Sequence, residues 1–231
     1  SGWPSNGIIL DKCEGLPISP GVIYNNFIAV GDSTTVDAYG INAIESAFMN
    51  YINNSIAVNH ASGLSAALEL AGGGANRVIN NILANFDGGY GLDYQETAGF
   101  PAFESDYNNI YSNVSAIARH KNNTFISINQ WSGSIGDDQN SVSTAPSFFS
   151  STDLHLCSSD LNNLGIPTPF VSVDIDGDFR NSTNPDIGAD EYSPISNLDL
   201  GNDTIVCKGT AVLLNGSLNF NDFYNAWSTG D

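Results

Sequence analysis

The chain has 231 residues, and its 25 acidic side chains against 6 lysines and arginines give a formal net charge of −19. A surface this acidic repels phosphate backbones and anionic lipid headgroups, which argues against nucleic-acid partners and direct membrane insertion. The apolar runs also fall short of the roughly 18 residues that a membrane span requires.

The first half of the chain consists of short alternating segments, such as residues 64–70, separated by Gly, Asn, Ser and Asp. These are strand and turn patterns. Four Asn-Asn pairs recur in this half at steps of 28, 27 and 28 residues: Asn25-Asn26, Asn53-Asn54, Asn80-Asn81 and Asn108-Asn109. A fixed period in this range is typical of a solenoid. We therefore expect an all-β fold, a right-handed parallel β-helix with about one coil per repeat. The pairs should occupy equivalent positions and stack about 4.8 Å apart as a ladder of side-chain hydrogen bonds.

The period is lost towards the C-terminus. The segment from Phe125 to Ile128 alternates like one more strand, and residues 131–192 are rich in proline. Because solenoids need a cover for the open end of the stack, we expect residues 1–193 to form the β-helix, with an irregular C-terminal cap from about residue 131. Residues 194–231 are predicted to be a linker and an incomplete Ig-like β-sandwich. We therefore expect the sequence to be a piece of a longer polypeptide.

Cys13 precedes the first repeat and Cys157 follows the last. Stacked coils would hold these two residues too far apart for a disulfide, whose Cα atoms lie within about 7 Å of each other. We expect both to be buried free thiols.

Three C-terminal stretches carry a resemblance to a known class of proteins. Residues 174–180 (Asp-Ile-Asp-Gly-Asp-Phe-Arg) and 185–192 (Pro-Asp-Ile-Gly-Ala-Asp-Glu-Tyr) resemble the closing signature of β-helix domains in secreted Bacteroidetes proteins. Residues 136–156 are similar to the segment that precedes this signature. Residues 198–204, with Cys207 and the Trp-Ser-Thr-Gly of residues 227–230, resemble the Ig/PKD-like repeats of giant surface proteins in that phylum.

The resemblance implies a long modular protein that the type IX system exports to the cell surface, of the gliding-motility or adhesin type. In the Ig/PKD-like family the first cysteine pairs with one near the end of the domain. No such residue follows Cys207, so the resemblance implies that Cys207 is unpaired within this sequence. The same phylum O-glycosylates exported proteins at Asp-Ser/Thr-apolar patterns, which makes Ser33 and Thr204 glycosylation candidates.

Parallel β-helices include pectate lyases and polygalacturonases, so carbohydrate chemistry is one alternative. The adjacent carboxylates Asp137 and Asp138 could perform glycoside hydrolysis. The basic triplet of residues 119–121 could supply a lyase with its base and cations, although a solvated turn is the simpler interpretation. The sequence lacks the His-Gly segment that glycosidases of this fold use. We therefore predict no catalytic residues and keep a polysaccharide lyase or glycosidase as the alternative.

A metal site is also not expected, although one segment imitates the start of an EF-hand loop. Its Ca²⁺ candidates are Asp174, Asp176 and Asp178, but the twelfth position is Pro185, where that loop requires a bidentate Glu. The structural alternative is that these carboxylates bond to turn amides and to Arg180.

Two other groups of side chains could bind a ligand. The three histidines are scattered and show no acidic partner in register, which argues against a histidine metal site; they are His60, His120 and His155. Six tyrosines could form a sugar-stacking face or pack inside the solenoid; they are Tyr24, Tyr51, Tyr90, Tyr94, Tyr107 and Tyr111.

We therefore expect a non-catalytic extracellular module of a large cell-surface adhesin, acting as a stiff spacer and as a display or binding surface. Its expected partners are the secretion and surface-attachment machinery and possible glycans or other surfaces, and no cofactor is expected. A glycan-binding module without catalysis is the second alternative.

Overall fold

The computed structural model describes residues 3–31, 36–97, 103–114 and 116–192. The chain divides into two compact units, Ser1–Tyr192 and Ser193–Asp231. The second unit, with the expected Ig-like strands, Cys207 and Thr204, lies outside the described residues, and so does Ser33.

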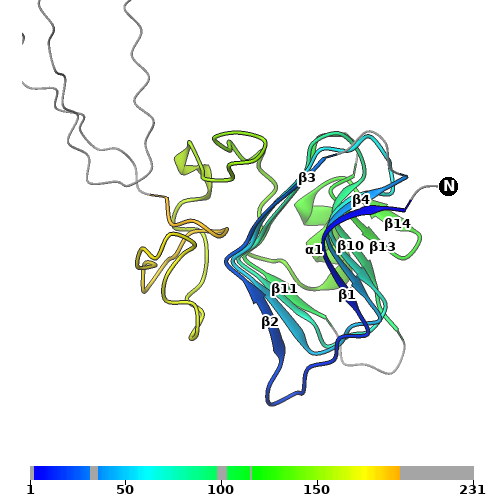
Figure 1. Cartoon of the computed structure of the whole chain (residues 1–231), viewed down its shortest axis with the longest axis horizontal. Helices are drawn as coiled ribbons and strands as arrows, with labels where there is room; N and C mark the ends of the chain where they lie inside the picture. Colours follow the sequence, from blue (N-terminus) through cyan, green and yellow to red (C-terminus); the bar gives the residue numbers. More distant parts are fainter. Residues whose placement is uncertain (1–2, 32–35, 98–102, 115, 193–231) are drawn as a thin grey trace, which may run out of the picture. The chain divides into compact units, whose positions relative to one another are not determined.

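The first unit forms an all-β solenoid of about three turns, in which three parallel sheets run along one stack (Figure 1). The six-stranded sheet contains, in order, β1 (Ser5–Asp11), β4 (Ala38–Ile44), β7 (Ala66–Ala71), β10 (Tyr90–Gln95), β13 (Ala118–His120) and β14 (Asn123–Phe125). A second sheet contains β2 (Gly21–Tyr24), β5 (Met49–Ile52), β8 (Arg77–Ile79) and β11 (Glu104–Asp106). The third contains β3 (Phe27–Val30), β6 (Ser55–Val58), β9 (Ile82–Asn85) and β12 (Asn109–Ser112). Within the described ranges, β13 and β14 form the one antiparallel strand pair.

Each coil adds one residue to several apolar columns along the stack. In the six-stranded sheet Ile41, Leu68 and Leu92 are neighbours in register, and all three are fully buried. Ile56 and Leu83 form a similar buried column in the third sheet. Because each such side chain contributes about 1.5–3 kcal/mol when it leaves water, the columns supply most of the driving force for stacking.

Glycines let the six-stranded sheet and the third sheet approach each other closely. A Cβ atom on Gly40 would lie 2.1 Å from Cγ2 of Ile56, and one on Gly91 would lie 3.0 Å from Cγ2 of Ile110. A larger residue at Gly40 would push the two sheets apart, so this position needs glycine for space.

The corner between the second and third sheets is built by the asparagine pairs. The first residue of three pairs has left-handed backbone geometry, with φ of 50° at Asn25, 50° at Asn53 and 57° at Asn80. Asparagine tolerates this conformation better than most residues do. In the fourth coil Tyr107 takes this place, with φ of 56°.

The expected equivalence of the four pairs is therefore wrong by one position in the fourth coil. Asn108 follows Tyr107 and is equivalent to the second asparagine of the other pairs, whereas Asn109 begins β12 and lies in register with Ile82. The local spacing of 28 residues concealed this offset, since Tyr107 substitutes for the asparagine of the corner.

The chain leaves the coils through a hairpin and a short helix. Phe125 ends β14 and Ile128 begins α1 (Ile128–Ile135), so the single strand expected there is not formed. Ser127 caps the helix by accepting a hydrogen bond from the backbone N of Gln130, and Gly136 ends it with φ of 90°. Trp131, fully buried, packs edge-on against Phe125 at 5.3 Å.

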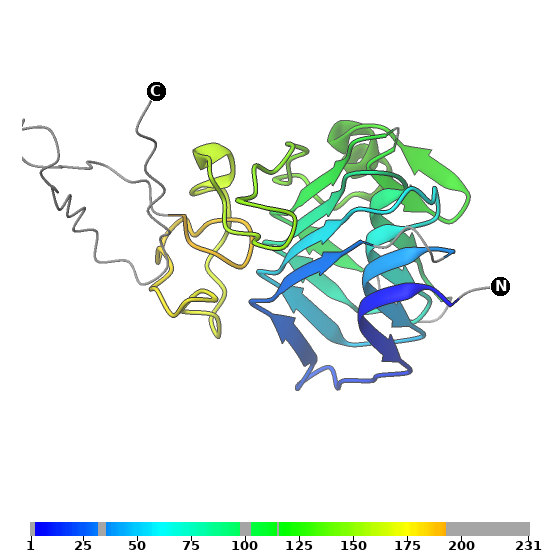
Figure 2. The ribbon, with the colours of Figure 1, turned by 45° about the horizontal axis from the view of Figure 1, so that its top comes forward.

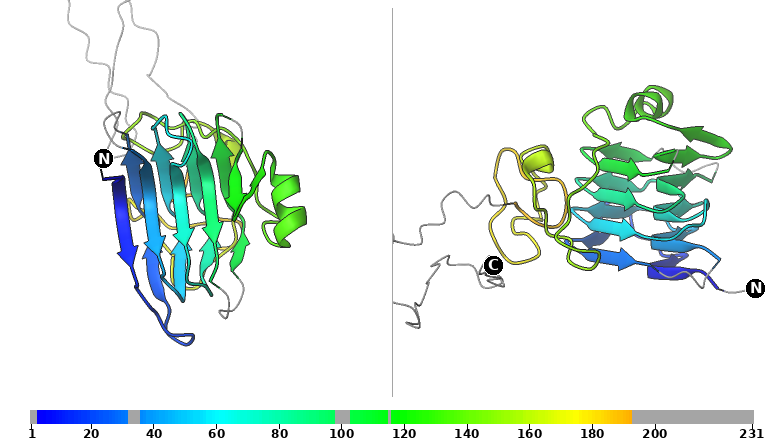
Figure 3. Two further views of the ribbon diagram at one scale, coloured as in Figure 1. Left: turned by 90° about the vertical axis from the view of Figure 1, so that its right-hand side faces the viewer. Right: turned by 90° about the horizontal axis from the view of Figure 1, so that it is seen from above.

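Residues 143–192 contain only isolated bridges and the short 3₁₀ helix η1 (Ser159–Leu161), and they lie beside the coils (Figure 2). The right-hand view of Figure 3 shows the stack from its side, with this segment next to it. Four asparagine side chains, one per coil, donate to its backbone oxygens: Asn109 to Thr144, Asn80 to Ile166, Asn53 to Gly188 and Asn25 to Val173. The segment therefore contacts the whole length of the stack, whereas the sequence predicted a cover over its end.

Candidate functional site

The second asparagine of each corner forms a side-chain ladder inside the solenoid. Nδ2 of Asn26, Asn54 and Asn81 donates to Oδ1 of the next asparagine at 2.8, 2.9 and 3.1 Å. Nδ2 of Asn108 continues the series by donating to Oδ1 of Asp138 at 3.2 Å. The ladder therefore ends on a carboxylate.

Asp138 is one of the two carboxylates proposed above for glycoside hydrolysis, and it is 1% exposed. Its oxygens also accept hydrogen bonds from Ser105 Oγ at 3.0 Å, Ser141 Oγ at 2.6 Å and Trp131 Nε1 at 2.7 Å. Burial raises the pKa of Asp138, and these donors oppose the rise. Because both oxygens are bonded inside the core, Asp138 terminates the ladder and offers no oxygen to a substrate.

A column of polar and charged side chains crosses the six-stranded sheet. Asn42, Glu69, Asp93 and Arg119 are consecutive neighbours in register there, and we call them the Glu69 column. Nε of Arg119 donates to Oδ1 of Asp93 at 3.0 Å, and its Nη2 bonds to Oδ2. The guanidinium also lies 4.9 Å from the ring centroid of Tyr90, within cation–π range.

The two carboxyl groups of this column, on Asp93 and Glu69, differ in their burial and in their partners. Arg119 pairs with Asp93, whose side chain is 0% exposed and also accepts a hydrogen bond from Gln95 at 2.8 Å. Glu69 is half-buried, and burial, together with the charge of Asp93, raises its pKa to about 7 against the opposing effect of Arg119. The side chain of Asp93 is inaccessible, so it cannot act as a catalytic partner of Glu69.

The basic triplet of residues 119–121 is not the solvated turn expected from the sequence. His120 Nε2 lies 2.6 Å from Oε2 of Glu96, and Lys121 forms an ion pair with the same carboxylate. Burial would raise the pKa of Glu96, but the hydrogen bonds from Lys121 and His120 outweigh it and lower this pKa to about 2. The triplet is therefore neutralised by Asp93 and Glu96 rather than open to a uronate.

The three Ca²⁺ candidates are separated by the structure. Asp174 is buried, and its Oδ1 accepts hydrogen bonds from the backbone N of Asp176 and of Asp178, both at 2.9 Å. Its Oδ2 accepts one from the backbone N of Glu191 at 3.0 Å. Asp174 therefore organises the turn through its amides, as the structural alternative expected, but Arg180 pairs with Glu191 and not with these carboxylates. The three carboxylates do not converge as an EF-hand would require.

Arg180 joins the same segment to the first coil. Its Nη2 donates to Asn25 Oδ1 at 3.0 Å and to the carbonyl oxygens of Gly188 and Ala189 at 3.0 and 2.8 Å. Its Nη1 lies 3.4 Å from Oε2 of Glu191. The guanidinium is buried, which lowers its pKa against the effect of the surrounding carboxylates. Arg180 therefore stabilises the segment and is not available to an external anion.

Asp176 instead approaches His155 and Asp190, a group that we call the His155 cluster. Their nitrogen and oxygen atoms all lie within 4.8 Å of one another. His155 Nε2 is 2.8 Å from Asp176 Oδ2, and its Nδ1 is 2.5 Å from Asp153 Oδ1. Burial would lower the pKa of His155, but these carboxylates raise it to about 9. Burial raises the pKa of Asp190 to about 6.

The expectation that the histidines lack acidic partners is therefore wrong for His155 and for His120. Local spacing contained a signal only for Asp153, two residues from His155, because Asp176 is 21 residues from His155 and Glu96 is 24 residues from His120.

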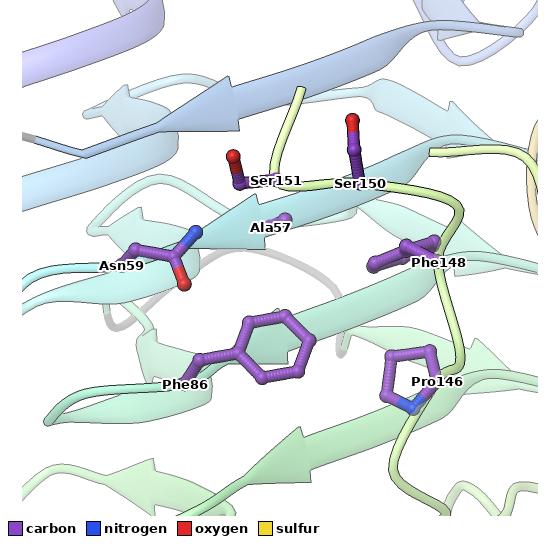
Figure 4. A pocket seen from close by; sticks show the side chains of 7 residues that line it. All are labelled: Ala57, Asn59, Phe86, Pro146, Phe148, Ser150 and Ser151. Carbon is purple, nitrogen blue, oxygen red and sulfur yellow. The ribbon is translucent and has the colours of Figure 1, made fainter. Parts of the chain in front are cut away.

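Two pockets lie against the irregular segment. One, of about 210 Å³, is drawn in Figure 4 and is lined by Ala57, Asn59, Phe86, Pro146, Phe148, Ser150 and Ser151. The other, of about 330 Å³, is lined by Pro167, Thr168, Val171, Ser172, Phe179, Arg180, Asn181, Ser182 and Pro185. The side chains that line the first pocket are aromatic, small, hydroxyl-bearing or, at Asn59, an amide, and none of them is charged.

The tyrosines do not form one exposed face. Tyr51 is fully buried and Tyr94 is 6% exposed, stacked between Phe103 and His120 at 4.5 and 5.1 Å. Tyr24, by contrast, is 49% exposed. A continuous sugar-stacking surface therefore cannot be built from this set.

The Glu69 column was not predicted from the sequence, although the pattern of its strands indicates it. Glu69 lies between Leu68 and Leu70, and Asp93 lies between Leu92 and Tyr94. Aligning successive coils on their buried leucines would have placed the two carboxylates side by side.

Comparison with protein-family models, with curated proteins and with solved structures finds no match to this chain. The phylum, the export route and the adhesin class implied by the C-terminal resemblance therefore stay predictions. No helix within the described ranges is long and apolar enough to cross a bilayer.

Proposed function

We propose that this chain is a non-catalytic extracellular module of a large cell-surface adhesin, acting as a stiff spacer and as a display or binding surface. The observation that supports this most is the asparagine ladder, which links four coils through side-chain hydrogen bonds of 2.8 to 3.1 Å. Main-chain hydrogen bonds join the strands of neighbouring coils, and the asparagine side chains join the same coils inside the stack. A stack held in both ways resists bending, and each coil adds about 4.8 Å to its length.

The finer parts of the proposal concern the architecture and the cellular context. The coils are right-handed, and residues 194–231 have the Ig/PKD-like fold. The protein belongs to a Bacteroidetes cell surface that it reaches through type IX secretion, and Ser33 and Thr204 carry glycans. These parts rest on the sequence resemblance, and the net charge of −19 is in keeping with an exported protein.

The partners in this proposal are the secretion and attachment machinery and glycans or other surfaces, without nucleic acid, membrane insertion or a catalytic cofactor. The burial of two carboxylates supports the non-catalytic role, because a lyase or glycosidase needs accessible ones. Asp138 is 1% exposed, and the side chain of Asp93 is 0% exposed. A carboxylate that water cannot reach cannot accept a proton from a substrate or attack it.

A glycan-binding module is the second candidate, and the Glu69 column favours it. Arg119 lies over Tyr90, and the half-buried Glu69 lies on the other side of Asp93 in the same column. Charged and aromatic side chains on a rigid sheet are suited to hydrogen bonding and stacking with a sugar.

The test measures turnover and adhesion with the full chain. We expect no release of reducing ends or unsaturated uronates from polygalacturonate, alginate or neutral glycans, and retention of chain-coated beads on at least one polysaccharide surface. Turnover that disappears in Glu69→Gln, while the circular dichroism spectrum is unchanged, would replace the adhesin with an enzyme. Adhesion lost in Arg119→Gln but kept in Lys12→Gln would locate glycan binding on the Glu69 column.

A further inference from the structure

The His155 cluster brings together three metal-ligating side chains from separate parts of the irregular segment. Asp176 is 21 residues from His155, and Asp190 lies in the stretch that also contacts the corner asparagines. The candidate ligand atoms lie within 4.8 Å of one another. Ligand atoms of one tetrahedral Zn²⁺ ion lie about 3.4 Å apart, so the widest pair must approach by up to about 1.4 Å for all three to reach one ion.

Carboxylates behind the cluster orient its ligands. Asp153 lies 2.5 Å from Nδ1 of His155, which directs Nε2 towards Asp176. Metal-binding histidines characteristically make such a second hydrogen bond to a carboxylate. One carboxylate also fixes both aspartate-bearing stretches, because Asp174 accepts from the backbone N of Asp176 and from that of Glu191, next to Asp190.

The charge of the region favours a cation. Within the described residues His155 is the one cationic partner of Asp153 and Asp176, and neither Asp176 nor Asp190 forms an ion pair with a lysine or arginine. Arg180, the nearest arginine in sequence, is engaged with Glu191 and with backbone carbonyls. A metal ion would therefore take the place of the proton between His155 Nε2 and Asp176.

We propose that His155 Nε2 and the carboxylates of Asp176 and Asp190 bind one Zn²⁺ ion, which fastens three turns of the irregular segment together. This inference goes beyond the spacer role and does not depend on it. The imidazole ligand favours Zn²⁺ over Ca²⁺, which takes six to eight oxygen ligands. On binding, His155 releases the proton on Nε2 and keeps the one on Nδ1 that it shares with Asp153. Phe27 of β3, whose ring lies edge-on to His155 at 4.8 Å, connects the site to the coils.

The experiment is calorimetric titration of the full, EDTA-stripped chain with ZnCl₂ in 150 mM NaCl, beside CaCl₂ and MnCl₂, with the melting temperature recorded in each. We expect one Zn²⁺ per chain, a rise in melting temperature, and affinity for Zn²⁺ at least tenfold above that for Ca²⁺. Asp176→Asn should weaken Zn²⁺ binding by about 100-fold, and Asp153→Asn by about tenfold, since it removes a group behind the ligand.

Asp178→Asn is the matched control, because this exposed carboxylate belongs to the same turn and does not belong to the cluster. It should bind Zn²⁺ as the wild type does. Equal weakening in Asp178→Asn and Asp176→Asn would show binding by general acidity and overturn the site. Absence of a one-to-one Zn²⁺ isotherm in the wild type, or tighter binding of Ca²⁺, would also overturn it. A second measurement does not depend on stability: the wild type loaded with Co²⁺ should show absorption bands that are absent in His155→Asn. The circular dichroism spectrum of this variant should be unchanged.

Discussion

The coils and the irregular segment belong to one compact unit but are stabilised in different ways. In the coils, the same contacts recur every 27 or 28 residues, as the ladder steps show. In residues 143–192, individual polar side chains hold the backbone. Asp174 accepts hydrogen bonds from three backbone amides, and Arg180 donates to two backbone carbonyls. A repeated contact tolerates the loss of one copy better than a unique contact does, unless the lost copy leaves buried polar groups unpaired.

The end of the ladder should show the largest effect. Asp138→Ala removes the acceptor of Asn108, Trp131, Ser105 and Ser141 in the core, and we expect a loss of about 3–5 kcal/mol in the free energy of unfolding. Urea denaturation of the two proteins measures it. Asp137→Ala, which changes the half-buried neighbour, should cost less than about 1 kcal/mol. Equal losses in the two variants would mean that Asp138 does not anchor the ladder.

The two asparagines of one corner should separate the coils from the irregular segment. Asn81→Ala breaks the ladder in its middle, and we expect a loss of about 2–4 kcal/mol for the whole unit. Asn80→Ala removes the pair of hydrogen bonds with Ile166 and should cost about 1–2 kcal/mol. Hydrogen exchange should then speed up in residues 160–190 and remain slow in β5, β6 and β9. Uniformly faster exchange in Asn80→Ala would contradict this division.

Glu69 gives the coils a dependence on pH. Its pKa is about 7 in the fold against a model value of 4.5, because of burial and Asp93, with smaller opposing and supporting effects of Arg119 and Asp37. A raised folded-state pKa means that its favourable contribution is present below about 4.5 and is lost as the pH rises to 7. Glu69→Gln should therefore reduce the fall in stability over this window by about 1–3 kcal/mol. An unchanged pH profile in urea denaturation would show that Glu69 is solvated.

The two thiols should show the smallest effect, because labelling them should barely change the free energy of unfolding. Cys157 in the irregular segment is exposed and Cys13 beside the first coil is half-buried, and both are free. The expectation of two buried thiols is therefore wrong for Cys157, and it holds only in part for Cys13. Iodoacetamide should modify Cys157 several times faster than Cys13, as measured by peptide mass spectrometry. Equal rates would show that the two environments do not differ.

The sequence predicts what recurs locally and fails where a contact is unique. The period of the asparagine pairs and the alternation in residues 64–70 lead to the parallel solenoid. The offset at Asn109 escaped this reasoning because Tyr107 adopts a left-handed conformation usually left to asparagine or glycine. Helix α1 was missed because its eight residues are too few for a clear helical period, although Ser127 and Gly136 are ordinary signals for its ends.

The His155 cluster could not be predicted from the sequence for a different reason. Its members come together only after the irregular segment has folded against the coils, and no local pattern records that path. The motif at Asp174, Asp176 and Asp178 drew attention to the correct turn. It suggested the wrong ligands, because the amides of the turn engage Asp174 while Asp176 alone reaches the cluster.

Because the irregular segment contacts one asparagine in every coil, it is matched to the number of coils. Asn25, Asn53, Asn80 and Asn109 each donate to a different carbonyl along it. A coil duplicated in the gene would bring one more outward-facing corner residue without a matching carbonyl, and a deleted coil would leave a carbonyl without its donor. Changes in the number of coils must therefore be accompanied by changes in the length of the segment, so the two parts of the domain are expected to evolve together.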